Sequence, residues 1–108
     1  MSADCIFCKI TNGSISSNKI YEDEDVIAFN DIHPKAKVHF LIIPKLHIES
    51  LASCEAQHQA LLGKMLLLAP NLAKEQGVAG FRTIINTGRE GGQEIFHIHL
   101  HVLGGGNE

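Results

Sequence analysis

The chain has 108 residues, 44% of them hydrophobic, and a formal net charge of −3, a composition typical of one globular domain rather than a disordered chain. The negative charge provides no general attraction to nucleic acid or an anionic membrane, so any phosphate chemistry must come from a local site. No apolar stretch approaches the roughly 20 residues that span a bilayer, and no secretory signal opens the chain, so we expect one cytoplasmic domain over residues 1–108.

The first half of the chain predicts a short helix followed by strands. Residues Asp4–Ile10 are compact and apolar and predict a short helical turn that ends at Asn12-Gly13. The segment Asp31–Pro34 predicts a loop, because residues that precede proline avoid the helical region. Apolar segments bounded by polar turns or by Pro44 predict three strands: Lys19–Tyr21, Val26–Phe29 and His39–Ile43.

A long helix is expected next, with Ser53 as its N-cap, Glu55 near the positive end of its dipole, and a bend or new turn at Pro70. Its apolar residues form two adjacent rows: Leu61, Met65, Leu68 and Leu72, and Leu62, Leu66, Ala69 and Ala73. One row is enough to cover a sheet. The second row indicates either a deeply buried helix or, as we expect, contact with a partner subunit.

The last third of the chain predicts a strand at Phe81–Asn86, a glycine-rich loop at Gly88–Gly92 and a final strand at Ile95–Leu103. The order of elements indicates an α+β fold: an antiparallel sheet of about five strands with one long helix and a short N-terminal helix.

Three histidines alternate with apolar residues in the last predicted strand: His97, His99 and His101. Successive side chains of a strand point to opposite faces, so these three share one face, with about 6.6 Å between neighbours. The residues between them take the other face, where they can pack against the long helix. Imidazole can act as nucleophile, general acid or metal ligand near neutral pH, so this row predicts a functional site.

Two kinds of site fit such a row: a metal site on one strand, or nucleophilic attack on phosphorus by one ring. The preceding loop favours the second, because Gly91-Gly92-Gln93 lets backbone N–H groups approach an anion closely. Asn86 and Thr87 add neutral donors.

The stretch Gly91–Gly105, which reads GGQEIFHIHLHVLGG, resembles the histidine-triad signature in the form typical of the Hint branch of that family. The similarity extends upstream to Cys5–Ile10, Phe29–Ile32 and His39–Ile48, so it covers nearly the whole chain in the right order. The resemblance implies a homodimer whose sheet continues across the subunits. It also implies an enzyme that binds purine nucleotides and hydrolyses nucleoside phosphoramidates.

The resemblance assigns roles to individual residues. His99 matches the nucleophile, which would form a covalent nucleotidyl-histidine, and His101 would contact the phosphate or the leaving group. Asp31 would bind the ribose hydroxyls. Five apolar residues would enclose the base: Ile6, Phe7, Ile10, Phe29 and Ile32. Four residues would surround the phosphate and leaving group: Asn86, Gly92, Gln93 and Glu94.

The chain departs from the family pattern at two places that bear on substrate preference. Some members carry serine where this chain has Glu94, and the Hint pattern tends to continue past the second glycine with arginine and a longer tail. Here the sequence reads Gly106-Asn107-Glu108 at its end.

The pair Cys5-x-x-Cys8 suggests a metal or redox pair rather than a disulfide, and Cys54 is expected to be inert. Some bacterial histidine-triad proteins have the same pair and bind structural zinc with two further histidines. The resemblance places those two histidine ligands at His47 and His97. The alternative to a zinc site is that Cys5 and Cys8 are two reduced, packed thiols. His33, His39 and His58 are expected to be structural or exposed.

The leading hypothesis is therefore a nucleoside phosphoramidate hydrolase. A dinucleoside polyphosphate hydrolase of the Fhit branch is disfavoured by the Leu-Gly-Gly after the triad. A nucleotidyltransferase of the galactose-1-phosphate type is disfavoured because that relative has glutamine at the position of His101. A nucleotide-binding or zinc-stabilised interaction protein with incidental turnover is the alternative outside enzymes.

Overall fold

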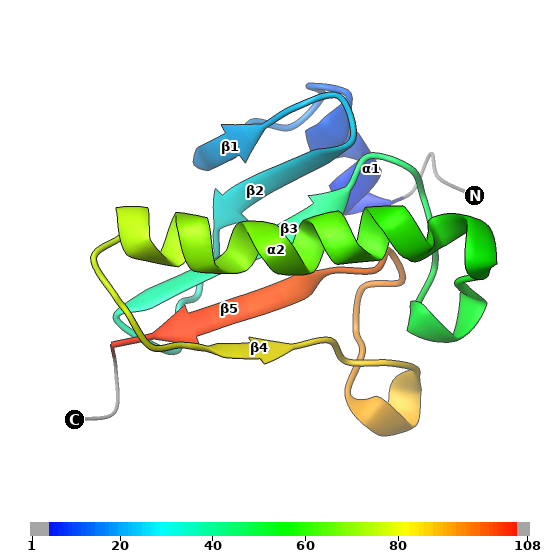
Figure 1. The fold of residues 1–108 in the computed structure, drawn as a ribbon. Coiled ribbons are helices and arrows are strands. Elements are labelled where there is room, and N and C mark those ends of the chain that lie inside the picture. Colours follow the sequence, from blue (N-terminus) through cyan, green and yellow to red (C-terminus); the bar gives the residue numbers. More distant parts are fainter. Residues whose placement is uncertain (1–4, 106–108) are drawn as a thin grey trace.

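A computed structural model describes residues 5–105 (Figure 1). The predicted N-terminal helix is present as α1 (Ile6–Thr11), and Asn12 caps its C-terminus. The strands are β1 (Lys19–Glu22), β2 (Val26–Asn30), β3 (Val38–Pro44), β4 (Arg82–Ile84) and β5 (Leu100–Gly104), and the long helix is α2 (Gln59–Glu75). Among the described residues, no helix is long and apolar enough to cross a membrane.

The strands form a single antiparallel sheet in the order β1-β2-β3-β5-β4, which confirms the expected α+β architecture. Helix α2 covers one face and α1 lies against the other (Figure 1). Residues that alternate along a strand therefore enter two separate cores. Phe40 and Leu100 pack with Met65 of α2, whereas Leu41 and Phe29 pack on the opposite side with the residues of α1. Strand β3 is buried along its whole length at the centre of the sheet.

The predicted start of the long helix was wrong. Ser53 is the last residue of a short 3-10 turn, η2 (Leu51–Ser53), which is capped by the hydroxyl of Ser50. Cys54 and Glu55 are extended, and a second turn, η3 (Ala56–His58), precedes α2. Extended backbone at these residues prevents one continuous helix from Ser53. Glu55 instead caps the second turn.

Pro70 lies inside α2, which continues to Glu75. Proline has no N–H, so the carbonyl of Leu66, four residues earlier, receives no hydrogen bond from Pro70. Leu66 lies on the exposed side of the helix, where water can donate to this carbonyl. No new turn begins at the proline, since one helix continues through it (Figure 1).

The last strand is shorter than predicted, because β5 begins at Leu100 rather than Ile95. Ile42 pairs with Leu100, so an extension of this register would place Pro44 opposite Ile98. Pro44 has no N–H to donate, and the ladder ends there. The N–H of Ile98 instead donates to the carbonyl of Ile48, at 2.7 Å. His97 and His99 therefore lie on the segment that leads into the sheet, which bends at Ile95–His97, rather than in the strand itself.

Candidate functional site

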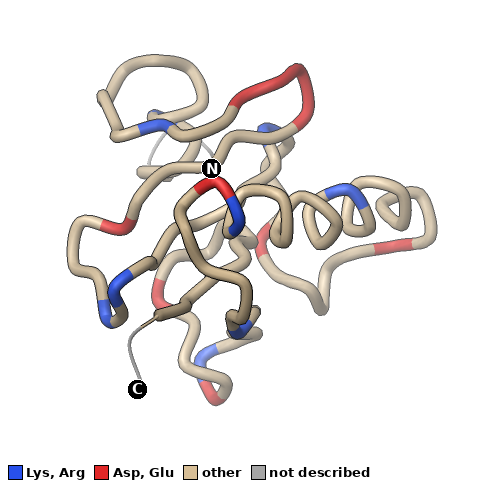
Figure 2. The backbone as a smooth tube through the Cα atoms, turned by 60° about the vertical axis from the view of Figure 1, so that its left-hand side comes forward, with Lys and Arg blue, Asp and Glu red and all other residues tan. Residues whose placement is uncertain are grey.

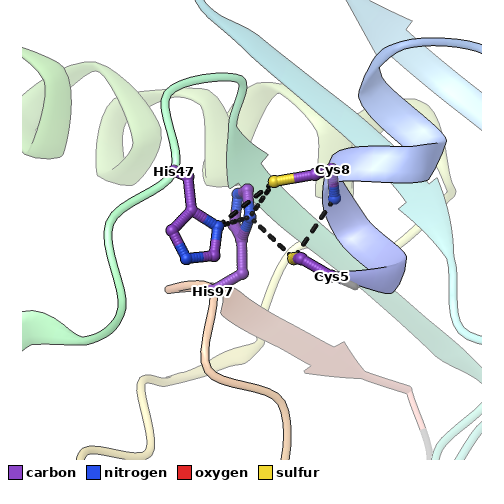
Figure 3. Close-up of side chains that lie close together, drawn as sticks. All are labelled: Cys5, Cys8, His47 and His97. Carbon is purple, nitrogen blue, oxygen red and sulfur yellow. Dashed lines mark hydrogen bonds between the residues drawn. The ribbon is translucent and has the colours of Figure 1, made fainter. Parts of the chain in front are cut away.

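Four predicted metal ligands from three separate parts of the chain meet beside α1 (Figure 3). Cys5 and Cys8 lie at the start of α1, His47 follows β3, and His97 precedes β5. The Cys8 Sγ lies 3.2 Å from the Nδ1 of His47, and the Cys5 Sγ lies 3.3 Å from the Nδ1 of His97. The two histidine Nδ1 atoms are 3.2 Å apart. All four potential ligand atoms lie within 4.8 Å of one another.

The hydrogen bonds of His97 leave the correct nitrogen free for a metal. Its Nε2–H donates to the carbonyl of Pro44 at 2.8 Å, so in the neutral ring the Nδ1 lone pair faces the cluster. Metal-bound histidines are usually oriented by such a bond to a backbone carbonyl. Zinc–sulfur and zinc–nitrogen bonds of about 2.3 and 2.0–2.1 Å place tetrahedral ligands about 3.3–3.8 Å apart. The observed separations and the Cys2His2 donor set fit such an ion.

Burial, followed by the neighbouring Cys5, raises the pKa of the Cys8 thiol to about 11. A bound divalent cation reverses this effect, because a coordinating thiol loses its proton. The remaining cysteine, Cys54, lies outside the cluster, with its thiol 3.7 Å from the carbonyl of Ser50.

The three histidines of the motif share one face, as predicted, although His97 and His99 precede the strand. The rings of His99 and His101 are 4.9 Å apart, and Phe7 of α1 packs edge-on against His99 at 5.1 Å. The Nδ1–H of His99 donates to the carbonyl of His97 at 2.8 Å. In the neutral ring, this bond leaves the Nε2 lone pair of His99 available for attack. Burial lowers the pKa of His99 and favours the neutral ring.

His101 is held by a histidine to which the sequence analysis assigned no part in the site. The backbone N–H of Lys35 donates to the Nδ1 of His39 at 3.1 Å, so neutral His39 carries its proton on Nε2. That Nε2 lies 3.0 Å from the Nδ1 of His101 and 3.4 Å from the Oδ2 of Asp31. The neutral His101 ring then carries its proton on Nε2. Burial, followed by His99 and His39, lowers the pKa of His101 to about 4.

His39 could have been found only from the pairing of β3 with β5. Leu41 pairs with His101, and His39 lies two residues before Leu41 on the same face of β3. The sequence shows the alternation of each strand but not the register between them. The register of β3 against β5 is therefore what brings His39 to within 3.0 Å of His101.

The group Asp31, His39 and His101 also has the composition of a metal site, but its tautomers differ from those of the cysteine cluster. The nitrogen of His39 that faces the group carries the proton in the neutral ring. In the cysteine cluster, the nitrogen of His97 that faces the group carries the lone pair. The first arrangement suits proton donation and the second suits metal ligation.

The glycine loop is closed by its own hydrogen bonds. Gly88 and Gly92 have φ values of +74° and +86°, which favour glycine, and η4 (Arg89–Gly91) lies between them. The N–H groups of Gly91 and Gln93 donate to the Gly88 carbonyl, and that of Gly92 donates to the Arg89 carbonyl. The N–H groups expected to approach an anion are thus bonded within the turn.

The remaining predicted contacts with the nucleotide are distributed between the core and the surface. Phe7, Ile10 and Phe29 are buried in the core beneath α1, whereas Ile6 and Ile32 are exposed, the latter to 85%. Asn86 lies close to Gly92, since a Cβ built on Gly92 would be 4.0 Å from the Asn86 Cγ. Glu94 is exposed. The short tail lies outside the described residues; it consists of Gly106, Asn107 and Glu108.

Among the described residues, acidic residues form a continuous run at the β1–β2 turn, Glu22–Asp25 (Figure 2). Lys64 of α2 bonds to Asp23 and Asp25 of that run at 2.8 and 2.9 Å. The acidic run therefore connects the turn to the helix.

A family model described as "Scavenger mRNA decapping enzyme C-term binding" matches residues 4–107. The purine nucleoside phosphoramidase of Escherichia coli K12 is 45% identical over 107 residues, which cover 97% of this chain and 90% of that protein.

Solved structures agree with this relationship. A HIT family hydrolase from Legionella pneumophila Philadelphia 1 has a TM-score of 0.94 and 42% identity, with 96% of this chain and 95% of that chain covered. A Zn-bound histidine triad family protein from Mycobacterium smegmatis has a TM-score of 0.85 and 34% identity, with 99% and 78% covered. The chain therefore belongs to the histidine-triad family.

Proposed function

We propose that this protein is a nucleotide hydrolase that cleaves the P–N bond of purine nucleoside 5′-phosphoramidates. The observation that carries the proposal is the ring of His99, whose Nδ1–H is bonded to a backbone carbonyl and whose Nε2 is free to attack. The similarity to a purine nucleoside phosphoramidase supports the same reaction over the alternatives.

In the proposed first step, the Nε2 of His99 forms a bond to the α-phosphorus while the P–N bond to the amine breaks. The neutral His101 ring, which His39 holds, donates a hydrogen bond from its Nε2–H to the departing amine nitrogen, and that nitrogen takes its proton from solvent water. Water then attacks phosphorus, the P–Nε2 bond breaks, and the proton that this water loses returns to solvent in place of the one that the amine took. The net reaction consumes one water molecule and releases AMP or GMP together with the free amine.

The nucleotide would be held by the residues that the family resemblance assigns. Asp31 would accept hydrogen bonds from the ribose hydroxyls, and the exposed Ile6 and Ile32 would cover the base at the edge of the buried Phe7. Asn86 and Gly92 would lie on the phosphate side, and Glu94 would face the leaving amine. A carboxylate there would favour a cationic leaving group and repel a second phosphate.

We further propose that Cys5, Cys8, His47 and His97 bind a structural zinc ion. The ion would supply cross-linking between α1, the segment after β3 and the approach to β5. The Zn-bound relative from Mycobacterium smegmatis supports this assignment, as does the tautomer of His97. The carbonyl of His97 holds His99, so the same residue connects the metal cluster to the nucleophile.

We also propose a homodimer in the cytoplasm, with the sheet continued across two subunits. The second apolar row of α2 contributes less to such an interface than expected, since its Ala69 and Ala73 belong to the core. Leu66 of the same row is 47% exposed, and the adjacent Leu67, which belongs to neither row, is 74% exposed. Strand β4 at the edge of the sheet has a free side that can pair with a second copy.

The proposed function is tested by incubating the purified protein with an adenosine 5′-phosphoramidate and measuring AMP release. We expect His99→Ala to abolish release while retaining nucleotide binding. The exposed His33→Ala is the control and should remain active. Equal activity of the wild type and His99→Ala would refute the mechanism. Faster hydrolysis of diadenosine polyphosphates in the same assay would instead favour the alternative branch, and binding without turnover would favour an interaction protein.

A further inference from the structure

The side-chain amide of Gln93 makes three hydrogen bonds within the protein, close to the histidines. It is only 4% exposed, and it lies between the glycine loop and the first histidine of the motif. Its Oε1 accepts a hydrogen bond from the N–H of Gly88 at 2.8 Å. Its Nε2 donates to the carbonyl of Glu49 at 2.7 Å and to that of Ile95 at 3.0 Å. Both amide hydrogens are therefore used inside the protein.

These bonds join three segments that the site requires. Gly88 begins the glycine loop, Ile95 lies two residues before His97, and Glu49 lies two residues after His47. The backbone of Gln93 strengthens the same connection, because its N–H donates to the Gly88 carbonyl at 3.0 Å. Gly88 and Gln93 thus bond to each other through both backbone and side chain, which closes the loop.

A direct contact between this amide and a phosphate would break at least one of the three hydrogen bonds of a side chain that is only 4% exposed. Such losses are costly because a buried unpaired polar group forfeits its hydration. We infer that Gln93 is a positioning residue, which holds the glycine loop and the His97–His99 segment in a fixed relation rather than touching the substrate. This inference rests on the proposed function for its kinetic part only.

The loop that Gln93 closes contains Gly92, next to Asn86 on the proposed phosphate side. A shift of this loop by about 1 Å relative to His99 would cost roughly 100-fold in rate, because attack requires close alignment of the reacting atoms. We therefore expect Gln93→Met, which has similar length but makes none of the three bonds, to lower kcat about 100-fold. Gln93→Glu retains the acceptor for Gly88 but loses both donors, and should also be slow.

The control is Leu72→Ala, a core substitution under α2 on the opposite face of the sheet. It should lower the melting temperature but leave kcat near the wild-type value. If Leu72→Ala lowers kcat as much as Gln93→Met at an equal loss of stability, the positioning role is refuted, since general destabilisation would then explain the effect.

A second measurement needs no activity and decides the inference even if the proposed reaction fails. In nucleotide-free protein, NMR should show slow exchange of the Gly88 amide in the wild type and fast exchange in Gln93→Met. Addition of AMP to the wild type should leave the side-chain NH2 signals of Gln93 nearly unmoved. A large shift of those signals with AMP, or unchanged Gly88 exchange in the variant, would overturn the positioning role in favour of direct contact or no role.

Discussion

We expect removal of the proposed zinc ion to lower the free energy of unfolding strongly. Two of the four ligands lie at the start of α1, a six-residue helix that is too short to be stable by itself. The other two come from segments distant in sequence, so one ion would join three parts of the chain. Ligand binding to the native state stabilises it by about 4 kcal/mol when the free ligand is 1,000 times its dissociation constant.

For a domain of this size, that energy corresponds to a fall of roughly 15 °C in melting temperature when a chelator removes the ion. Calorimetry with and without chelator measures the fall, and metal analysis should give one zinc per chain. Cys8→Ser should melt near the temperature of the chelated wild type and no longer respond to chelator. Cys54→Ser is the matched control, because this cysteine lies outside the cluster, and it should retain both zinc and the response.

The reasoning is refuted if the wild type contains no zinc and melts at the same temperature with and without chelator. It is also refuted if Cys8→Ser retains stoichiometric zinc. A response lost equally in Cys54→Ser would show that the ligand set is wrong.

Two further predictions concern pH and assembly. The pKa of His101 is lowered to about 4 in the folded protein, so between about pH 6.5 and pH 4 the unfolded chain binds a proton that the folded protein does not. The free energy of unfolding should therefore fall as pH decreases from 7 to 5, and His101→Asn should show a shallower fall in denaturant titrations; an equal slope would contradict the shift. Leu67→Glu should convert the proposed dimer to a monomer in sedimentation experiments. Leu46 is also exposed but lies outside α2, so Leu46→Glu should leave the dimer intact. A wild-type monomer, or a dimer that survives Leu67→Glu, would exclude this interface.

Local sequence patterns were sufficient for most elements and for the candidate residues. The alternation of His97, His99 and His101 with apolar residues predicted a shared face because side chains of extended backbone alternate. The pair of cysteines and the two matching histidines were nominated by resemblance, and the fold brings all four together. The antiparallel sheet followed from short strands without a repeating helix between them.

Contacts between distant segments decided the rest. The start of α2 depended on a cap at Ser50 and two short turns, and the start of β5 depended on Pro44, which faces the extension of that strand. The bond between His39 and His101 required the register of β3 against β5. A sequence specifies which side chains are available, but hydrogen-bond partners and tautomers depend on which atoms meet. For that reason the sequence predicted the histidine row, while only the tertiary structure showed which ring nitrogen of each histidine is hydrogen-bonded within the protein.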